Sequence, residues 1–169
     1  MTQSLLSPLQ QLMTASVRPG KLIWIGLRPA RDVAMLTPDS VNLLTARGIE
    51  GDRYDTKRDG ARQVTLISRE GLAAIASYLG RDKIAPELLR RNLVTDGINL
   101  TALKSFRFRI GPALLETTGE CAPCSRMETA LGQGGYNAVR GHGGITAKII
   151  EGGEVHIGDV ITRIDDGAG

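Results

Sequence analysis

The chain has 169 residues, a formal net charge of +3 and 41% hydrophobic residues, with an isoelectric point of about 9.1. A chain of this size buries roughly 70% of its unfolded surface, which excludes a largely disordered protein. Aromatic residues make up only 4%, which argues against a base-stacking nucleic-acid surface. No apolar run reaches the ~20 residues of a membrane span, and the N-terminus lacks the pattern of a secretory signal. We therefore expect a cytoplasmic protein that binds neither membranes nor nucleic acid.

The N-terminal segment has the pattern of a short amphipathic helix. Apolar residues recur at helical spacing between residues 5 and 17. Ser7, Pro8 and Gln10 match an N-cap, a first-turn proline and a capping-box glutamine. The apolar face has no basic residues beside it, so we expect it to pack on the domain or on a partner subunit, not on a membrane. The pattern divides the chain into an N-terminal helix, residues 1–18, and a single domain, residues 19–165.

Short strands dominate the rest of the chain. Alternating residues bounded by glycine and proline turns predict strands at 21–27, 33–36, 62–68, 92–95, 106–110, 113–118, 146–151, 154–157 and 159–164. Helical spacing predicts helices at 69–79, 87–91 and 125–131. No internal repeat is present, and the strand–helix alternation of a doubly wound sheet fails in the last third. The sequence predicts a mainly β fold with helical insertions (α+β), built on a barrel or curled sheet, with frayed ends at residues 165–169.

The two cysteines, Cys121 and Cys124, flank Ala122 and Pro123. This spacing suits a redox pair, half of a zinc site, a metal ligand beside a bystander, or two thiols in a bend made by the proline. Zinc needs two further ligands, and only the distant His142 and His156 are available. A thioredoxin-type pair lies in a βαβ unit, whereas the flanks here are rich in predicted strands. A glycine- and arginine-rich segment, 132–144, follows. A thiolate beside backbone amides and guanidinium groups suits a soft metal on an anionic, phosphate-bearing cofactor.

Six short blocks in one order give the chain a family resemblance. They lie at 48–53, 62–67, 89–93, 108–111, 121–124, and 143–147 with 158–159. In order and spacing they resemble the MOSC domain, which forms the C-terminus of molybdenum cofactor sulfurases and also occurs alone in bacteria. The resemblance covers roughly residues 20–164. It implies a MOSC-type β-barrel that binds a molybdenum cofactor of the molybdopterin type or handles its sulfur.

The resemblance also implies a set of site residues. In related amidoxime- and hydroxylamine-reducing proteins a single cysteine ligates molybdenum, and by its position after the proline that residue is Cys124 here, both metal ligand and catalytic residue. Arg126 lies close by in the sequence and favours the thiolate form. We expect the cofactor to contact Arg53, Arg62, Arg90, Arg91, Asn92, Arg126, Arg140, Gly143 and Gly144, since arginine forks and close glycine backbone suit a phosphate. Asp52 either orients Arg53 or closes a turn.

The chain departs from its relatives in two ways. Tyr54 stands where relatives often carry a histidine, and no lysine-centred pyridoxal phosphate site, flavin module or iron–sulfur module is recognisable. An external electron donor or sulfur donor protein is therefore expected. The leading hypothesis is the reduction of a small N-hydroxylated or N-oxygenated compound at cysteine-ligated molybdenum, whose oxygen leaves as water. The alternatives are a persulfide or cofactor carrier for molybdoenzyme maturation, and a non-catalytic β-barrel binding module, which Tyr54 favours slightly.

Overall fold

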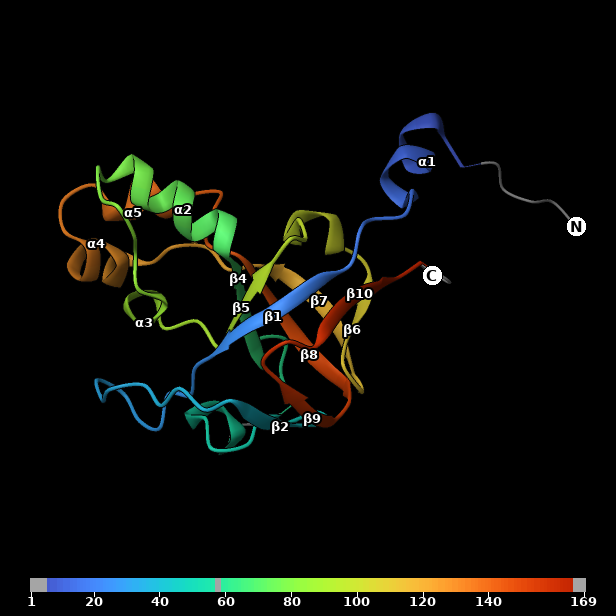
Figure 1. The fold of residues 1–169 in the computed structure, drawn as a ribbon, viewed down its shortest axis with the longest axis horizontal. Helices are drawn as coiled ribbons and strands as arrows, with labels where there is room; N and C mark the ends of the chain where they lie inside the picture. Colours follow the sequence, from blue (N-terminus) through green and yellow to red (C-terminus); the bar gives the residue numbers. More distant parts are fainter. Residues whose placement is uncertain (1–5, 57–58, 166–169) are drawn as a thin grey trace, which may run out of the picture.

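The computed structural model describes residues 6–56 and 59–165 of the chain. Its centre is a closed barrel (Figure 1). In order around the barrel the strands are β1 (Gly20–Ile25), β10 (Val160–Ile164), β6 (Arg107–Ile110), β7 (Ala113–Glu120), β8 (Ile145–Glu151), β4 (Val64–Ser68) and β5 (Leu93–Asp96). β1 closes the ring because it pairs with β10 on one side and with β5 on the other. The predicted mixed fold with a β-barrel is therefore confirmed.

One parallel strand pair sets the position of the helices. β4 and β5 run parallel, with Leu66 opposite Leu93, whereas the other described barrel pairs are antiparallel. A parallel pair needs a crossover connection, and α2 (Arg69–Tyr78) and α3 (Pro86–Leu89) lie in it. Ser68 is the N-cap of α2, since its side chain accepts a hydrogen bond from the Gly71 N–H. This connection carries the chain outside the barrel and returns it at the start of β5.

The barrel interior is filled by the buried side chains of its strands. In β6, Phe108 and Ile110 are buried while Arg107 is exposed, as strand alternation requires. A second apolar cluster lies outside the barrel, where α2 and α3 pack with α4 (Ser125–Leu131) and α5 (Gly135–Val139). Figure 1 shows these helices gathered at one end of the molecule. The second cluster thus gives the segment after the cysteines a rigid support.

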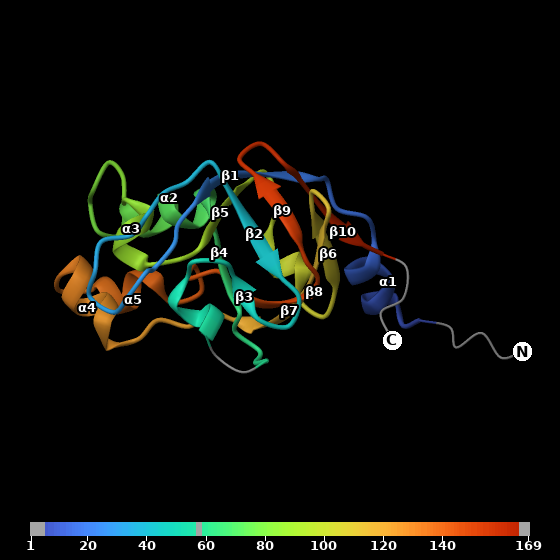
Figure 2. The same cartoon turned by 90° about the horizontal axis from the view of Figure 1, so that it is seen from below.

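A small sheet covers part of the barrel. Its order is β3 (Gly48–Ile49), β2 (Ser40–Leu44) and β9 (Gly153–His156), all antiparallel. Val41, Leu43, Ile49 and Val155 belong to the same buried cluster as the barrel interior. In Figure 2 the sheet lies beside β8, away from α4 and α5. The short helices η1 (Arg53–Thr56) and η2 (Leu100–Leu103) follow β3 and β5.

The N-terminal helix α1 (Pro8–Thr14) has the predicted start, and its apolar face is exposed. The capping box of Ser7 and Gln10 is present, yet no residue of α1 is buried. The helix is held at its C-terminal end, where the buried guanidinium of Arg163 donates to the carbonyls of Met13, Thr14 and Ala15. In the described residues its apolar face does not pack on the domain, and packing on a partner subunit stays a prediction. The predicted helix also included Leu5, which lies outside the described part, as do residues 166–169.

Three further sequence predictions need correction. The strand predicted at 33–36 is a loop with a single bridge between Leu27 and Leu36, because no second strand lies beside it. Neither β2 nor α5 was predicted, since polar and glycine residues mask their periodicity. The helix predicted at 87–91 ends at Leu89, because Arg90 adopts a left-handed conformation with φ 51°. These differences all involve segments whose structure depends on distant partners.

Candidate functional site

The two cysteines differ in exposure although only two residues separate them. Cys124 is exposed and occupies the N-cap position of α4, whereas Cys121 is buried; both are free thiols. The Cys121 N–H donates to the carbonyl of Gly144, 2.9 Å away, which continues the pairing of β7 with β8. The strand therefore places Cys121 in the fold, and the turn through Pro123 presents Cys124 to solvent. Of the two thiols, only Cys124 is open to a ligand from outside.

Arg91 lies buried behind this segment. Its guanidinium donates to the carbonyls of Gly143 (2.9 Å), Leu89 (2.8 Å) and Cys121 (3.4 Å). No carboxylate forms an ion pair with it in residues 6–56 or 59–165. Since guanidinium stays protonated in proteins, a positive charge is held inside the protein without a described counter-ion. Arg91 was expected to contact a phosphate. In the structure its side chain instead links three backbone segments through hydrogen bonds.

The charges around Arg91 define the electrostatics of the site. Burial lowers the pKa of Arg91, and the positive charges of Arg28 and Arg62 lower it further, while the thiols of Cys121 and Cys124 oppose the shift. Arg28, Arg62 and both cysteines therefore lie within electrostatic range of Arg91. Arg62 is exposed, and Arg28 is partly so and pairs with Asp52. The positive charge near Arg91 suits an anionic ligand.

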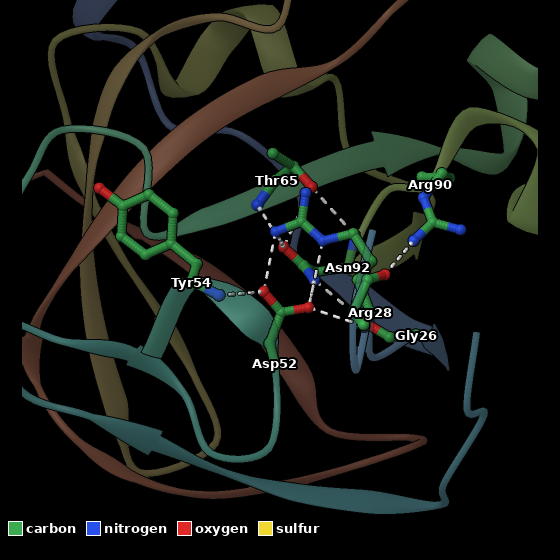
Figure 3. Close-up of polar contacts among 8 residues, drawn as sticks. Gly26, Arg28, Asp52, Tyr54, Thr65, Arg90 and Asn92 are labelled. Atoms are coloured by element: carbon green, nitrogen blue, oxygen red, sulfur yellow. Dashed lines mark hydrogen bonds and ion pairs between the residues drawn. The ribbon is translucent and has the colours of Figure 1, made fainter. Parts of the chain in front are cut away.

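Arg28, which the sequence analysis did not single out, is held by Asp52 (Figure 3). The Arg28 Nε and Nη2 atoms donate to the two carboxylate oxygens at 3.1 and 2.9 Å, and its backbone N–H donates at 2.8 Å. Asp52 therefore orients Arg28, and it also accepts the Tyr54 N–H at 3.2 Å. Burial raises the pKa of Asp52, but the hydrogen bonds and charge of Arg28 outweigh it and leave that pKa below its usual value. Only the fold brings these two side chains, 24 positions apart, together.

Asn92 completes this buried network. Its side-chain oxygen accepts from the backbone N–H and the hydroxyl of Thr65, both at 3.1 Å. Its side-chain nitrogen donates to Asp52 at 3.2 Å and to the Gly26 carbonyl at 3.1 Å. Because Asn92 is fully buried, its amide is committed to the protein. Its role in this structure is to join β4, β5 and the segment after β1.

The remaining predicted arginines lie in different surroundings. Arg90 donates to the carbonyls of Val33 (2.9 Å) and Ala30 (3.1 Å), so its guanidinium holds the loop that presents Arg28. Arg53 begins η1, and its N–H donates to the Arg28 carbonyl at 2.7 Å. Arg126 is exposed on α4, two residues after Cys124. Arg140 is exposed after α5, and its Nη1 donates to Asn137 at 3.3 Å.

The two glycines lie where the backbone crosses other segments closely. A Cβ on Gly144 would lie 1.8 Å from the Leu66 carbonyl oxygen, and its φ is +89°. A Cβ on Gly143 would lie 2.4 Å from the Cys121 carbonyl oxygen. Close packing of β8 on β4 and on the cysteine segment therefore requires both glycines. The neighbouring His142 ring packs against Tyr78, with centroids 5.3 Å apart.

The cysteine spacing allowed several kinds of metal site, and the side chains near Cys121 and Cys124 distinguish between them. In the described part of the chain, no group of three or more His, Cys, Asp or Glu residues is arranged to hold a metal ion. A structural zinc site of the cysteines and histidines therefore has no support there. An exposed soft thiol beside an uncompensated buried cation and an exposed arginine matches a metal carried on an anionic cofactor. The residues present fit a molybdopterin-type group at Cys124.

Comparison with known families bears on the fold and the blocks described above. The model of the MOSC domain matches residues 39–162, well over half of the chain. The chain belongs to the MOSC domain family. No curated protein matches the chain. In the part of the chain that the structure describes, no helix is long and apolar enough to span a membrane.

Solved structures show the same fold. YuaD from Bacillus subtilis is 22% identical with a TM-score of 0.74, covering 85% of this chain and 94% of that one. YiiM from Escherichia coli is 20% identical with a TM-score of 0.65, covering 85% and 69%. YiiM from Geobacillus stearothermophilus is 15% identical with a TM-score of 0.68, covering 89% and 77%. At these identities the likeness concerns the fold of this MOSC-domain protein, not its activity.

Proposed function

We propose that this MOSC-domain protein binds a molybdenum cofactor of the molybdopterin type through Cys124 and reduces small N-hydroxylated or N-oxygenated compounds. One observation carries the proposal: an exposed thiol lies beside a buried arginine that has no described carboxylate partner. A buried charge is costly unless it is compensated. A bound anion supplies that compensation, and the thiol supplies a soft ligand. Membership of the MOSC family agrees with this combination.

The side chains divide into two groups by their roles. Cys124 ligates the metal, and Arg53, Arg62 and Arg126 bind the phosphate and the pterin. The guanidinium of Arg28 is held by Asp52 and Asn92. Arg90, Arg91 and Asn92 have donors committed to the protein, so they act by holding the loops and supplying positive charge. Gly143 and Gly144 keep the backbone of β8 close to the cysteine segment. Arg140 is exposed directly after α5 and, within the described residues, has no role in holding these loops.

When bound, the cofactor supplies the two-electron removal of an oxygen atom from the substrate nitrogen. Two electrons and two protons are then required to release that oxygen as water, so a separate donor protein delivers the electrons. The chain's own contribution is to orient the ligand through Cys124 and to neutralise its negative charge.

The deciding experiment measures molybdenum and pterin per chain in protein purified from a cofactor-competent host. Near-stoichiometric amounts are expected for the natural sequence. Cys124→Ser should lose most of the metal, because a hydroxyl is a poor ligand for a soft metal. The matched control is Cys121→Ser, which should keep most of it, since Cys121 is buried. Equal loss in both variants would contradict a single cysteine ligand.

A carrier of sulfur is the second candidate, favoured by the exposure of the free Cys124 thiol. In that case a donor protein transfers a sulfur atom to Cys124, and the persulfide passes to an apo-enzyme. Mass spectrometry of protein incubated with a cysteine desulfurase and cysteine distinguishes the two functions. An added sulfur on Cys124 with no bound molybdenum, after attempted reconstitution, would replace the reductase by the carrier.

A further inference from the structure

A groove lies where the barrel meets the outer helices, and Cys121 is among the residues that line it. Its volume is about 530 Å³, within the range of small-molecule sites. α2, η2, the end of β7, α5 and the start of β8 form its walls, and Cys124 is not part of the lining. Arg140, Gly143 and Gly144, which the sequence analysis expected at the cofactor, line the groove, whereas the proposed metal ligand Cys124 lies outside it.

The middle of the groove is apolar. Ala74 of α2, Leu100 of η2, Pro123 and Ile145 contribute apolar surface, and Tyr136 adds an aromatic side chain. Tyr136 is 42% exposed, so its ring is open to a ligand. An aromatic or aliphatic body of a small molecule fits such a surface, because burial of apolar area drives binding.

The groove contains one ion pair and two charged side chains that form no ion pair within the described residues. Lys104 and Glu120 form an ion pair with each other. Arg140 and Glu70 also line the groove, and neither has an ion-pair partner in residues 6–56 and 59–165. The Nη1 of Arg140 donates to Asn137, which leaves its other donors, and Glu70 accepts one bond from the Gly97 N–H at 2.9 Å. The groove thus offers one cation and one anion to a ligand.

We propose that this groove is a second binding site, which takes a small zwitterionic molecule of the amino-acid class with an apolar side group. The carboxylate of the ligand binds Arg140, its ammonium group binds Glu70, and its apolar group lies against Tyr136 and Leu100. Glu70 on α2 and Arg140 after α5 line the same groove, and their opposite charges complement the two charged groups that such a ligand carries on its α carbon. The site goes beyond the proposed cofactor chemistry and works with or without bound metal.

Calorimetric titration of the full chain tests the ligand class with three probes. L-phenylalanine carries both charges, phenethylamine lacks the carboxylate, and 3-phenylpropionate lacks the ammonium group. L-phenylalanine should bind saturably, and each singly charged probe should bind at least about fivefold more weakly, since one charge-assisted contact is lost. Equal affinity for all three probes, or no saturable binding of L-phenylalanine, would overturn the proposal.

Variants locate the site independently of the ligand series. Arg140→Gln should weaken L-phenylalanine and 3-phenylpropionate while leaving phenethylamine unchanged. Ala74→Trp fills the groove and should abolish binding, whereas Ala73→Trp, on the exposed side of the same helix, should not. Unchanged binding in Ala74→Trp would place the ligand elsewhere, and far-ultraviolet circular dichroism verifies that each variant folds. Molybdenum content is measured in the same samples, so a failure of the cofactor proposal is recognised separately.

Discussion

At the scale of single residues, Arg91 shows how burial changes the expected role of a side chain. In the sequence it is one of several arginines suited to a phosphate. In the structure its guanidinium joins Leu89, Cys121 and Gly143 through their carbonyls. A side chain that is 7% exposed has little surface left for a ligand. Its effect on the site is therefore electrostatic and structural.

Replacement of Arg91 by methionine should destabilise the protein strongly. Three carbonyls lose their donor in the interior, and we expect a loss of about 2–4 kcal/mol in the free energy of unfolding. Urea denaturation of metal-free protein measures it. Arg126→Met, an exposed change on α4, is the control and should stay within about 0.5 kcal/mol. A stable Arg91→Met variant that merely loses the cofactor would restore Arg91 as a phosphate ligand.

At the scale of elements, the approach of β8 to β4 determines where the cysteine segment lies. Gly144 occupies the point of closest contact, directly before β8 begins. The Gly144 carbonyl accepts the Cys121 N–H, so the same residue contacts both neighbours. The path of the chain from β7 to Cys124 therefore depends on a position at which no side chain fits.

Gly144→Ala should be severely destabilising, with a loss of more than about 3 kcal/mol or failure to fold, because its Cβ would overlap the Leu66 backbone. Gly141→Ala is the matched control. Its φ is also positive, at +78°, but no heavy atom lies within 4 Å of the added Cβ. Backbone strain alone then costs about 1–2 kcal/mol. Thermal unfolding compares the two variants, and equal losses would show that contact with β4 is unimportant.

At the scale of the whole molecule, the network around Asp52 joins the barrel to the segment that follows the small sheet. Asp52 comes just after β3, Arg28 follows β1, and Asn92 precedes β5. Their hydrogen bonds connect segments up to 66 positions apart, the longest running from Asn92 to Gly26. An ionised carboxylate is required for the Arg28 contacts, so the stability of the whole fold is linked to the protonation of Asp52.

This linkage predicts an acid-sensitive term in stability. The pKa of Asp52 is lower in the folded protein than its ordinary value of 3.8, because Arg28 outweighs the effect of burial. The contribution is therefore complete above about pH 5 and is lost as the pH falls through 3.8 and then through the lower folded pKa. Asp52→Asn should lower stability at neutral pH and flatten the dependence between pH 5 and 2. Chemical denaturation across this range measures it, and parallel curves for both proteins would refute the linkage.

Local patterns predicted much of this fold, because alternation and helix caps depend on neighbouring residues. The strand β6 and the helices α2 and α4 were predicted close to their observed limits, and so was the start of α1. The loop at 33–36 and the helix α5 were not, since burial against distant segments decides both. The same holds for the candidate site. The spacing of the cysteines indicated Cys124, whereas no pattern in the neighbouring residues indicated that Arg28 belongs to the site.

The sequence by itself determined that this protein is a mainly β chain with helical insertions (α+β), a MOSC-type barrel and a single pair of closely spaced cysteines. Periodicity, turn residues and block order are properties of the chain, so they can be read without contacts. The tertiary structure alone decided which thiol is exposed, which arginine Asp52 holds, and where the second groove lies. Arg91 meets Gly143 across 52 positions and Arg163 meets Met13 across 150. Such partners depend on the closure of the barrel, which brings distant segments together.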